Sequence, residues 1–140
     1  MAFRARTRDQ ISNQMRRIRK VDTKPELIVR RIAHRLGYRF RLHRRDLPGT
    51  PDLTFPSKRK VVLVHGCFWH RHRNCKKSTT PKSNAEFWQA KFAANKRRDR
   101  VKTSELRSKG FSVLVVWECE TLRPSRLRSK LSKFLGLEVN

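Results

Sequence analysis

The sequence gathers metal-binding side chains in one short basic loop. Cys67, His72 and Cys75 follow the spacing C-x4-H-x2-C, at which two thiolates and an imidazole can bind the same ion. Tetrahedral zinc takes four nitrogen or sulfur ligands, and Cys119, just beyond the last expected strand, could supply the fourth. His70 is an alternative to His72 as the imidazole ligand, and idle cysteines beside a His-rich loop are the alternative to a metal site. We expect a structural zinc ion that clamps a loop with too few apolar residues to pack by itself.

A second set of side chains could bind magnesium and activate water. Asp52 stands at the start of an expected strand, twelve residues before Val64 ends the next strand, and a hairpin would bring these positions together. A carboxylate and a neighbouring backbone carbonyl can bind Mg²⁺, whose remaining ligands are waters and phosphate oxygens. His65 and His70 are close enough in sequence to face the same phosphate, where imidazole can deprotonate water or stabilise developing charge. Without these histidines, an Asp after a Pro would be interpreted as a turn residue.

The long helix expected before Gly110 places further candidates on one face. At 100° per residue, one stripe contains Trp88, Lys91, Phe92, Asn95, Asp99 and Lys102. A neighbouring apolar face contains Phe87, Ala90, Ala94 and Val101. The stripe combines aromatic rings, an ammonium and an amide that could contact base edges, and a carboxylate within reach of a phosphate site. The alternative is that the aromatic side chains belong to the core and that Asp99 pairs with a neighbouring arginine.

Phe68 and Trp69 lie in the same loop as the candidate zinc ligands. Aromatic anchors buried beneath the zinc would explain the pair. The other explanation is an apolar wedge, because DNA-bending proteins insert such side chains between base steps and unstack them. Since a mismatched pair lowers the cost of unstacking, a wedge would also favour mismatched DNA.

Helices must position many of these residues. A capping-box pattern at Thr23 and Glu26, followed by apolar residues at intervals of four, predicts a helix that a glycine then ends. A second capping-box pattern at Ser83 and Glu86 predicts the start of the long helix, which ends at Gly110. A short final helix is marked by Leu127, Leu131 and Phe134.

Apolar runs predict strands at 38–42, 52–55, 61–64 and 111–117. The run at 61–64 is typical of a central strand that is covered on both faces. The first twenty residues carry seven Arg or Lys and one Asp, and they predict a basic helical arm over residues 1–20. No repeat or linker divides the chain, so we expect a single domain over residues 1–140.

The composition favours a folded protein that binds nucleic acid. With 36 Lys and Arg against 11 Asp and Glu, the chain has a formal charge of +25, and a polyanion would relieve the resulting self-repulsion. Leu, Ile, Val and Phe account for 35 of 140 residues, above the ~20% below which so charged a chain is expected to be disordered. No apolar run approaches the ~18 residues of a membrane span, and no signal peptide is recognisable. We expect a soluble, cytoplasmic protein that DNA binding associates with the nucleoid.

Four segments together resemble the very-short-patch repair (Vsr) endonucleases. They are residues 41–53, 65–70, 95–99 and 116–119, and the block His65-Gly66-Cys67-Phe68-Trp69-His70 is highly specific. The resemblance implies an α/β fold related to type II restriction enzymes, with a mixed β-sheet flanked by helices and a structural zinc site. The usual D/E-x-K element of that fold is missing near the expected central strand, and the histidines would replace its lysine.

The resemblance also implies roles for individual residues. Asp52 matches the metal-binding carboxylate, and the backbone carbonyl of Val64 would be a second Mg²⁺ ligand. The other matches to active-site residues are His65, His70, Asp99 and Glu26. The matches to the zinc ligands are Cys67, His72, Cys75 and Cys119. The matches to DNA-contacting residues are the wedge of Phe68, Trp69 and Trp88, with Lys91 and Asn95 facing the mismatched pair.

The resemblance implies a Mg²⁺-dependent endonuclease that nicks one strand 5′ to the T of a T·G mismatch. Such a mismatch is the product of 5-methylcytosine deamination. Its substrate would be double-stranded DNA, and mismatch-repair proteins are candidate partners. We expect a monomer, because nicking one strand needs a single active site. The alternatives are a restriction-like nuclease that cuts paired duplex and a zinc-stabilised nucleic-acid-binding module without cleavage.

Overall fold

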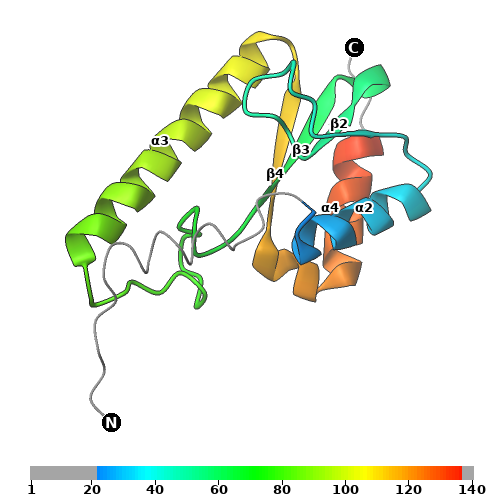
Figure 1. Ribbon diagram of the computed structural model, residues 1–140. Coiled ribbons are helices and arrows are strands. Elements are labelled where there is room, and N and C mark those ends of the chain that lie inside the picture. The colour runs from blue at the N-terminus through cyan, green and yellow to red at the C-terminus, as the bar shows by residue number, and fades with distance from the viewer. Residues whose placement is uncertain (1–21, 137–140) are drawn as a thin grey trace.

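A computed structural model describes residues 22–136 (Figure 1). The elements, in chain order, are α2 (Lys24–Arg35), β1 (Arg41–Leu42), β2 (Leu53–Phe55), η1 (Pro56–Lys58), β3 (Lys60–His65), α3 (Ala85–Ser108), β4 (Ser112–Trp117), η2 (Glu118–Leu122) and α4 (Pro124–Gly136). This order agrees with the helices and strands predicted for this part of the chain. The basic arm predicted for residues 1–20 lies outside the described residues and stays a prediction.

The strands form one mixed four-stranded sheet in the order β1-β2-β3-β4. β2 pairs antiparallel with β1 and with β3, whereas β3 and β4 are parallel. This pattern follows from the connections, because a short turn can join antiparallel strands whereas parallel strands need a longer crossover, here through α3. The parallel register pairs His65 with Trp117, so the carboxyl-terminal ends of β3 and β4 lie side by side.

Helices cover both faces of the sheet: α2 and α4 lie on one face and α3 on the other (Figure 1). The core beneath α2 and α4 contains Val29, Ala33, Leu53, Phe55, Val62, Val116, Leu127, Leu131 and Leu135. The core beneath α3 contains Leu47, Val61, Leu63 and Leu106. Successive residues of β3 thus enter opposite cores, which explains its continuous apolar run. Each fully buried aliphatic side chain contributes about 1.5–3 kcal/mol of transfer free energy.

The two long helices begin differently from one another. At α2 the predicted cap is present: Thr23 Oγ1 accepts a hydrogen bond from the N–H of Glu26 at 3.4 Å. The Glu26 carboxylate reaches back to accept from the N–H of Asp22 at 3.0 Å. The capping box predicted at Ser83 is wrong, because α3 begins after Asn84, which is left-handed (φ +56°) and makes no side-chain capping bond. Asn tolerates this conformation better than most residues.

The apolar face predicted on α3 is wrong in part. Ala90 is exposed and Val101 is 49% exposed, whereas Phe92 and Leu106 are the buried residues of the helix. The helix therefore packs through the stripe that carries the candidate functional residues. The reason is tertiary: the loop after β3 and the sheet both lie against that stripe, and helical spacing alone does not say which side they occupy.

The predicted strand at 38–42 is also shorter in the structure. Only Arg41 and Leu42 pair with β2, and Leu42 is 42% exposed because β1 lies at the edge of the sheet. In α4 the buried residues are Leu127, Leu131 and Leu135, while Phe134 is only partly buried. None of the helices described is both long and apolar enough to span a membrane.

Candidate active site and metal centre

His65, His70 and Asp99 form one stacked and hydrogen-bonded group. β3 delivers His65 at its end, and the following loop places the His70 ring on it, with centroids 4.0 Å and planes 7° apart. Asp99, from the middle of α3, lies with its Oδ2 2.6 Å from Nδ1 of His70. Because a carboxylate only accepts, Nδ1–H donates to Asp99, and Nε2 of a neutral His70 then carries a lone pair.

The surroundings of this group fix its charges. Burial, with contributions from the nearby His70 and Lys102, lowers the pKa of His65 to about 4, although Asp99 acts in the opposite direction. Burial alone would raise the pKa of Asp99, but the hydrogen bond from His70 and the neighbouring positive groups leave that pKa below its ordinary value. Near neutral pH, His65 is therefore an uncharged imidazole and Asp99 is a carboxylate.

Asp52 meets β3 one residue before His65. Its Oδ2 accepts a hydrogen bond from the N–H of Val64 at 2.6 Å, so the β2–β3 hairpin brings together the two positions expected from the sequence. Burial raises the pKa of Asp52 to about 7; the hydrogen bond from Val64 opposes this rise, and the nearby Glu26 carboxylate adds to it. Asp52, which is partly buried, and the nearby Glu26 carboxylate therefore form a donor set that fits a divalent cation.

Glu26, the second carboxylate, is 2% exposed at the start of α2. Its Oε2 lies 3.0 Å from the N of Asp22, 3.2 Å from Nη2 of Arg30 and 3.1 Å from Nε2 of His43. A buried carboxylate is costly unless it is paired and hydrogen-bonded, and these donors supply that compensation. The three contacts fall on one oxygen, which restricts the orientation of the carboxylate.

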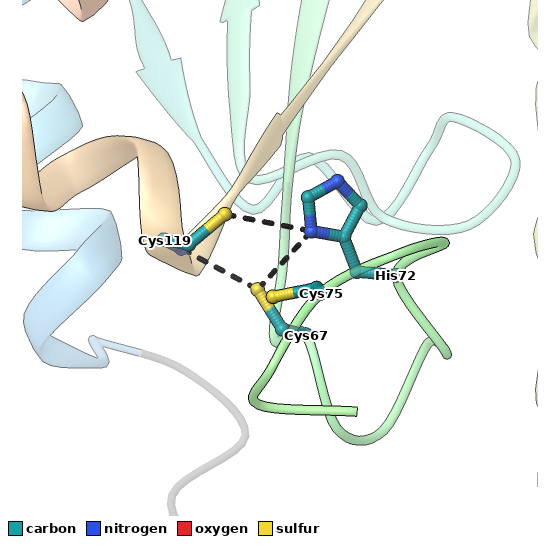
Figure 2. Close-up of side chains that lie close together, drawn as sticks. All are labelled: Cys67, His72, Cys75 and Cys119. Carbon is teal, nitrogen blue, oxygen red and sulfur yellow. Dashed lines mark hydrogen bonds between the residues drawn. The ribbon is translucent and has the colours of Figure 1, made fainter. Parts of the chain in front are cut away.

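The candidate zinc ligands converge on one point from two distant segments (Figure 2). Their donor atoms, from Cys67, His72, Cys75 and Cys119, all lie within 4.8 Å of one another. Nδ1 of His72 is 3.6 Å from Sγ of Cys67 and 3.4 Å from Sγ of Cys119. The cluster therefore includes His72, whereas His70 points its Nδ1 to Asp99. Three sulfurs and one imidazole nitrogen form a set compatible with a structural zinc site.

The surrounding chain supports this cluster. The hydroxyl of Ser78 lies 2.8 Å from the carbonyl oxygens of both Cys67 and His72, so its one proton is shared between them and holds the loop around the donors. The N–H of Cys119 donates to Sγ of Cys67 at 3.4 Å, which ties η2 to the loop. Burial, with the thiol groups of Cys75 and Cys119, raises the pKa of Cys67 to about 12, although the hydrogen bond from the N–H of Cys119 acts in the opposite direction. A cation at this point would offset the cost of a buried thiolate, so the donor set fits zinc.

An aromatic cluster joins the same loop to α3. The Phe68 ring makes edge contacts with Trp69, Trp88 and Phe92 at centroid distances of 4.9, 5.6 and 5.2 Å. The guanidinium of Arg71 lies over the Phe92 ring at 4.1 Å. Phe92 is 6% exposed and is a core residue, whereas the other three rings are partly exposed. One end of the cluster is thus anchored and the other reaches the surface.

Two further members of the α3 stripe lie beside this cluster. Nδ2 of Asn95 donates to the carbonyl of Trp69 at 3.0 Å, which couples the loop to the helix. Lys91, one turn from Trp88, is partly exposed. The alternative in which Asp99 pairs with an arginine is wrong, because its carboxylate pairs with the imidazole of His70.

Trp117, Arg30 and His43 also contact residues of the site, although the sequence pattern indicated no role for them. Trp117 stacks on His72 with centroids 4.2 Å apart and meets His65 edge-on at 5.3 Å, so it links the zinc cluster to the histidine pair. Its place at the end of a strand parallel to β3 could have indicated this contact. Arg30 stands four residues after Glu26 on α2, a spacing that predicts an ion pair. No local pattern indicated the contact of His43 with Glu26.

Known proteins similar to this chain are DNA endonucleases. The family described as DNA mismatch endonuclease Vsr matches residues 5–77. The type II nicking enzyme V.XorIIP of Xanthomonas oryzae pv. oryzae is 48% identical over 86% of this chain and 88% of its own length. The DNA mismatch endonuclease Vsr of Escherichia coli is 35% identical over 89% of this chain and 84% of its own length.

Among solved structures, the catalytic domain of the homing endonuclease I-Bth0305I has a similar fold. The TM-score is 0.56 at 21% sequence identity, and the match covers 81% of this chain and 94% of that domain. At this identity the likeness shows the fold alone, a nuclease-like mixed sheet with flanking helices. Since the family match covers half of the sequence and the relatives align along most of it, the chain belongs to the Vsr family of DNA mismatch endonucleases.

Proposed function

We propose that this protein nicks one strand of double-stranded DNA on the 5′ side of the T in a T·G mismatch, with Mg²⁺ as its catalytic cofactor. The observation that carries the proposal is the stacked pair of His65 and His70, with Asp99 hydrogen-bonded to His70, at the end of β3, where Asp52 accepts a hydrogen bond from Val64. These residues combine a candidate general base with a partly buried carboxylate, Asp52, that can take part in cation binding. Hydrolysis of a phosphodiester needs both functions.

In this proposal His70 is the general base. The hydrogen bond to Asp99 keeps the proton on Nδ1, so Nε2 can accept the proton of the attacking water. The negative charge of Asp99 then stabilises the imidazolium that forms. His65, whose burial keeps it neutral, stacks on the ring and restrains its orientation, and its own N–H can donate to a phosphate oxygen.

Asp52 and the backbone carbonyl of Val64 would hold the magnesium ion, with Glu26 as a nearby supporting carboxylate. When bound, Mg²⁺ would polarise the scissile phosphate and neutralise its developing charge. The hydrogen bond from Val64 N–H orients the Asp52 carboxylate toward β3 before any cation binds. Such preorganisation avoids rearranging the carboxylate during the reaction.

Mismatch recognition would use the aromatic cluster. Phe68, Trp69 and Trp88 are partly exposed, and their contacts with one another and with buried Phe92 make a rigid support for a wedge between base steps. Lys91 and Asn95, on the same helix face, would meet the edges of the T·G pair. A weakly stacked mismatch costs less to open than a Watson–Crick pair, which gives the wedge its selectivity.

Zinc would have a structural role in this protein. By joining the loop of Cys67, His72 and Cys75 to Cys119, it would fix the segment that carries both the wedge and His70. The formal charge of +25 supports a large electrostatic contribution to DNA binding, with affinity that falls as salt rises. We propose that the chain acts as a monomeric, single-domain enzyme whose basic first twenty residues contact the DNA backbone.

The test is cleavage of end-labelled duplexes that differ at one base, T·G against C·G, with and without Mg²⁺. The proposal expects a single nick 5′ to the mismatched T, only with the metal ion. Cleavage of both strands of the C·G duplex would support a restriction-like activity instead. DNA binding without any cleavage, and no change of any activity in Asp52→Ala, would support a non-catalytic binding module.

A further inference from the structure

His43 contacts the buried carboxylate beside the proposed magnesium site. Its Nε2 lies 3.1 Å from Oε2 of Glu26, and the side chain of His43 is 21% exposed. Its N–H also donates to the carbonyl of Asp52, at 3.4 Å. One residue of the loop after β1 therefore touches both acidic residues of the site, one through its side chain and the other through its backbone.

The conformation of His43 is unusual for a residue with a side chain. Its φ is +45°, in the left-handed region that sterically disfavours residues other than glycine and, to a smaller extent, Asn, Asp and His. This backbone turn directs the imidazole toward α2 while the strand pairing of β1 with β2 is kept. A sparsely populated conformation persists where surrounding contacts determine it, and such residues cluster at functional sites.

Asp22, Glu26 and His43 do not form a separate metal site. Asp22, Glu26 and His43 have ligand atoms close together, but Nη2 of Arg30 lies 2.6 Å from Oδ1 of Asp22 and 3.2 Å from Oε2 of Glu26. The guanidinium already supplies the positive charge at this point. His43 and Arg30 thus act together as hydrogen-bond partners of one carboxylate oxygen.

We propose that His43 is a positioning residue of the endonuclease: its Nε2–H holds Oε2 of Glu26 and thereby directs the other carboxylate oxygen, Oε1, toward Asp52 and its divalent cation. This inference rests on the proposed function, because it assigns a partner to the same catalytic site. Partners of this kind, which orient a metal-site carboxylate without touching the ion, typically change metal affinity by about 10- to 100-fold when they are removed.

The variant His43→Asn separates this contact from the backbone conformation. Asn tolerates a left-handed φ but is too short to reach Glu26, so the loop is retained while the hydrogen bond is lost. His43→Gln places an amide N–H close to the position of Nε2 and is the conservative rescue. His34→Asn is the matched control, because His34 is an exposed histidine in the last turn of α2.

The first readout is the binding of Mn²⁺ to the zinc-loaded, full-length protein without DNA, followed by electron paramagnetic resonance. We expect His43→Asn to weaken Mn²⁺ binding by at least about tenfold, His43→Gln to recover most of it, and His34→Asn to match the wild type. Melting temperatures measured without Mn²⁺ identify loss of fold. Equal Mn²⁺ affinity in His43→Asn and wild type, with both folded, would overturn the proposal.

The second readout is the Mg²⁺ concentration that gives half-maximal nicking. In a double-mutant cycle with Glu26→Gln, the effect of His43→Asn should disappear, because His43 acts through that carboxylate. Additive losses would show that His43 acts elsewhere and would also overturn the proposal. Failure of wild-type nicking would refute the proposed function alone, since Mn²⁺ binding still decides the role of His43.

Discussion

Replacing Asp99 with Asn is expected to slow nicking strongly while leaving DNA binding intact. In the wild type, Oδ2 of Asp99 accepts from Nδ1 of His70 at 2.6 Å, and the two side chains are only 20% and 28% exposed. The substitution keeps the size of the side chain but removes its charge. An amide can also present its NH₂ group to the ring, which would favour the wrong tautomer of His70.

The expected magnitude follows from this geometry. A hydrogen bond to a charged group contributes about 1.5–3 kcal/mol, against about 1 kcal/mol for a neutral one. The attraction between a carboxylate and an imidazolium at ~4 Å adds up to about 4 kcal/mol at an effective dielectric constant near 20, and partial exposure reduces it. A net loss of about 2–3 kcal/mol from the transition state corresponds to a roughly 30- to 150-fold lower rate.

The assay is single-turnover nicking of a T·G duplex at saturating enzyme and Mg²⁺, with DNA binding measured separately in chelator-free buffer without Mg²⁺. Asp46→Asn is the matched control, because it removes the same charge from a carboxylate whose side chain is 62% exposed and which pairs with Arg44. If Asp99→Asn, folded and bound to DNA, nicked within about threefold of the wild-type rate, the role assigned to the His70–Asp99 pair would be refuted.

Three further outcomes are expected. The pKa of Asp52 is raised from 3.8 to about 7, so the folded protein binds this proton more tightly than the unfolded chain does. The free energy of unfolding should therefore fall as pH rises from about 4 to 7. Asp52→Asn should flatten that fall in melting experiments without Mg²⁺. Cys75→Ser should lower the zinc content below about one per chain and reduce the melting temperature, whereas an unchanged melting temperature would argue against a structural zinc. Trp88→Ala should weaken binding to a T·G duplex by about tenfold more than binding to a C·G duplex, as band-shift titrations can measure; equal weakening of both would contradict a wedge.

Local sequence patterns predicted most elements and most candidate residues of this protein. Thr23 and Glu26 indicated the start of α2 because a cap involves residues three apart in the chain. The apolar run before His65 indicated a buried central strand that ends at the site. The errors were also local: Ser83 has the residue type of a cap, but the chain enters α3 through a left-handed Asn84 instead.

The sequence by itself determined which side chains are available, their spacing along each element and the strongly basic character of the chain. Only the tertiary structure decided which of them meet. His65 and His70 stack, and Asp99 approaches them from the crossover helix α3. Glu26 approaches Asp52 from α2, and His43 contacts both of them from the loop after β1. The physical reason is that helical and strand periodicities fix contacts only within a few residues. Pairings between distant segments depend on how the two cores pack against opposite faces of the sheet, which no local pattern encodes.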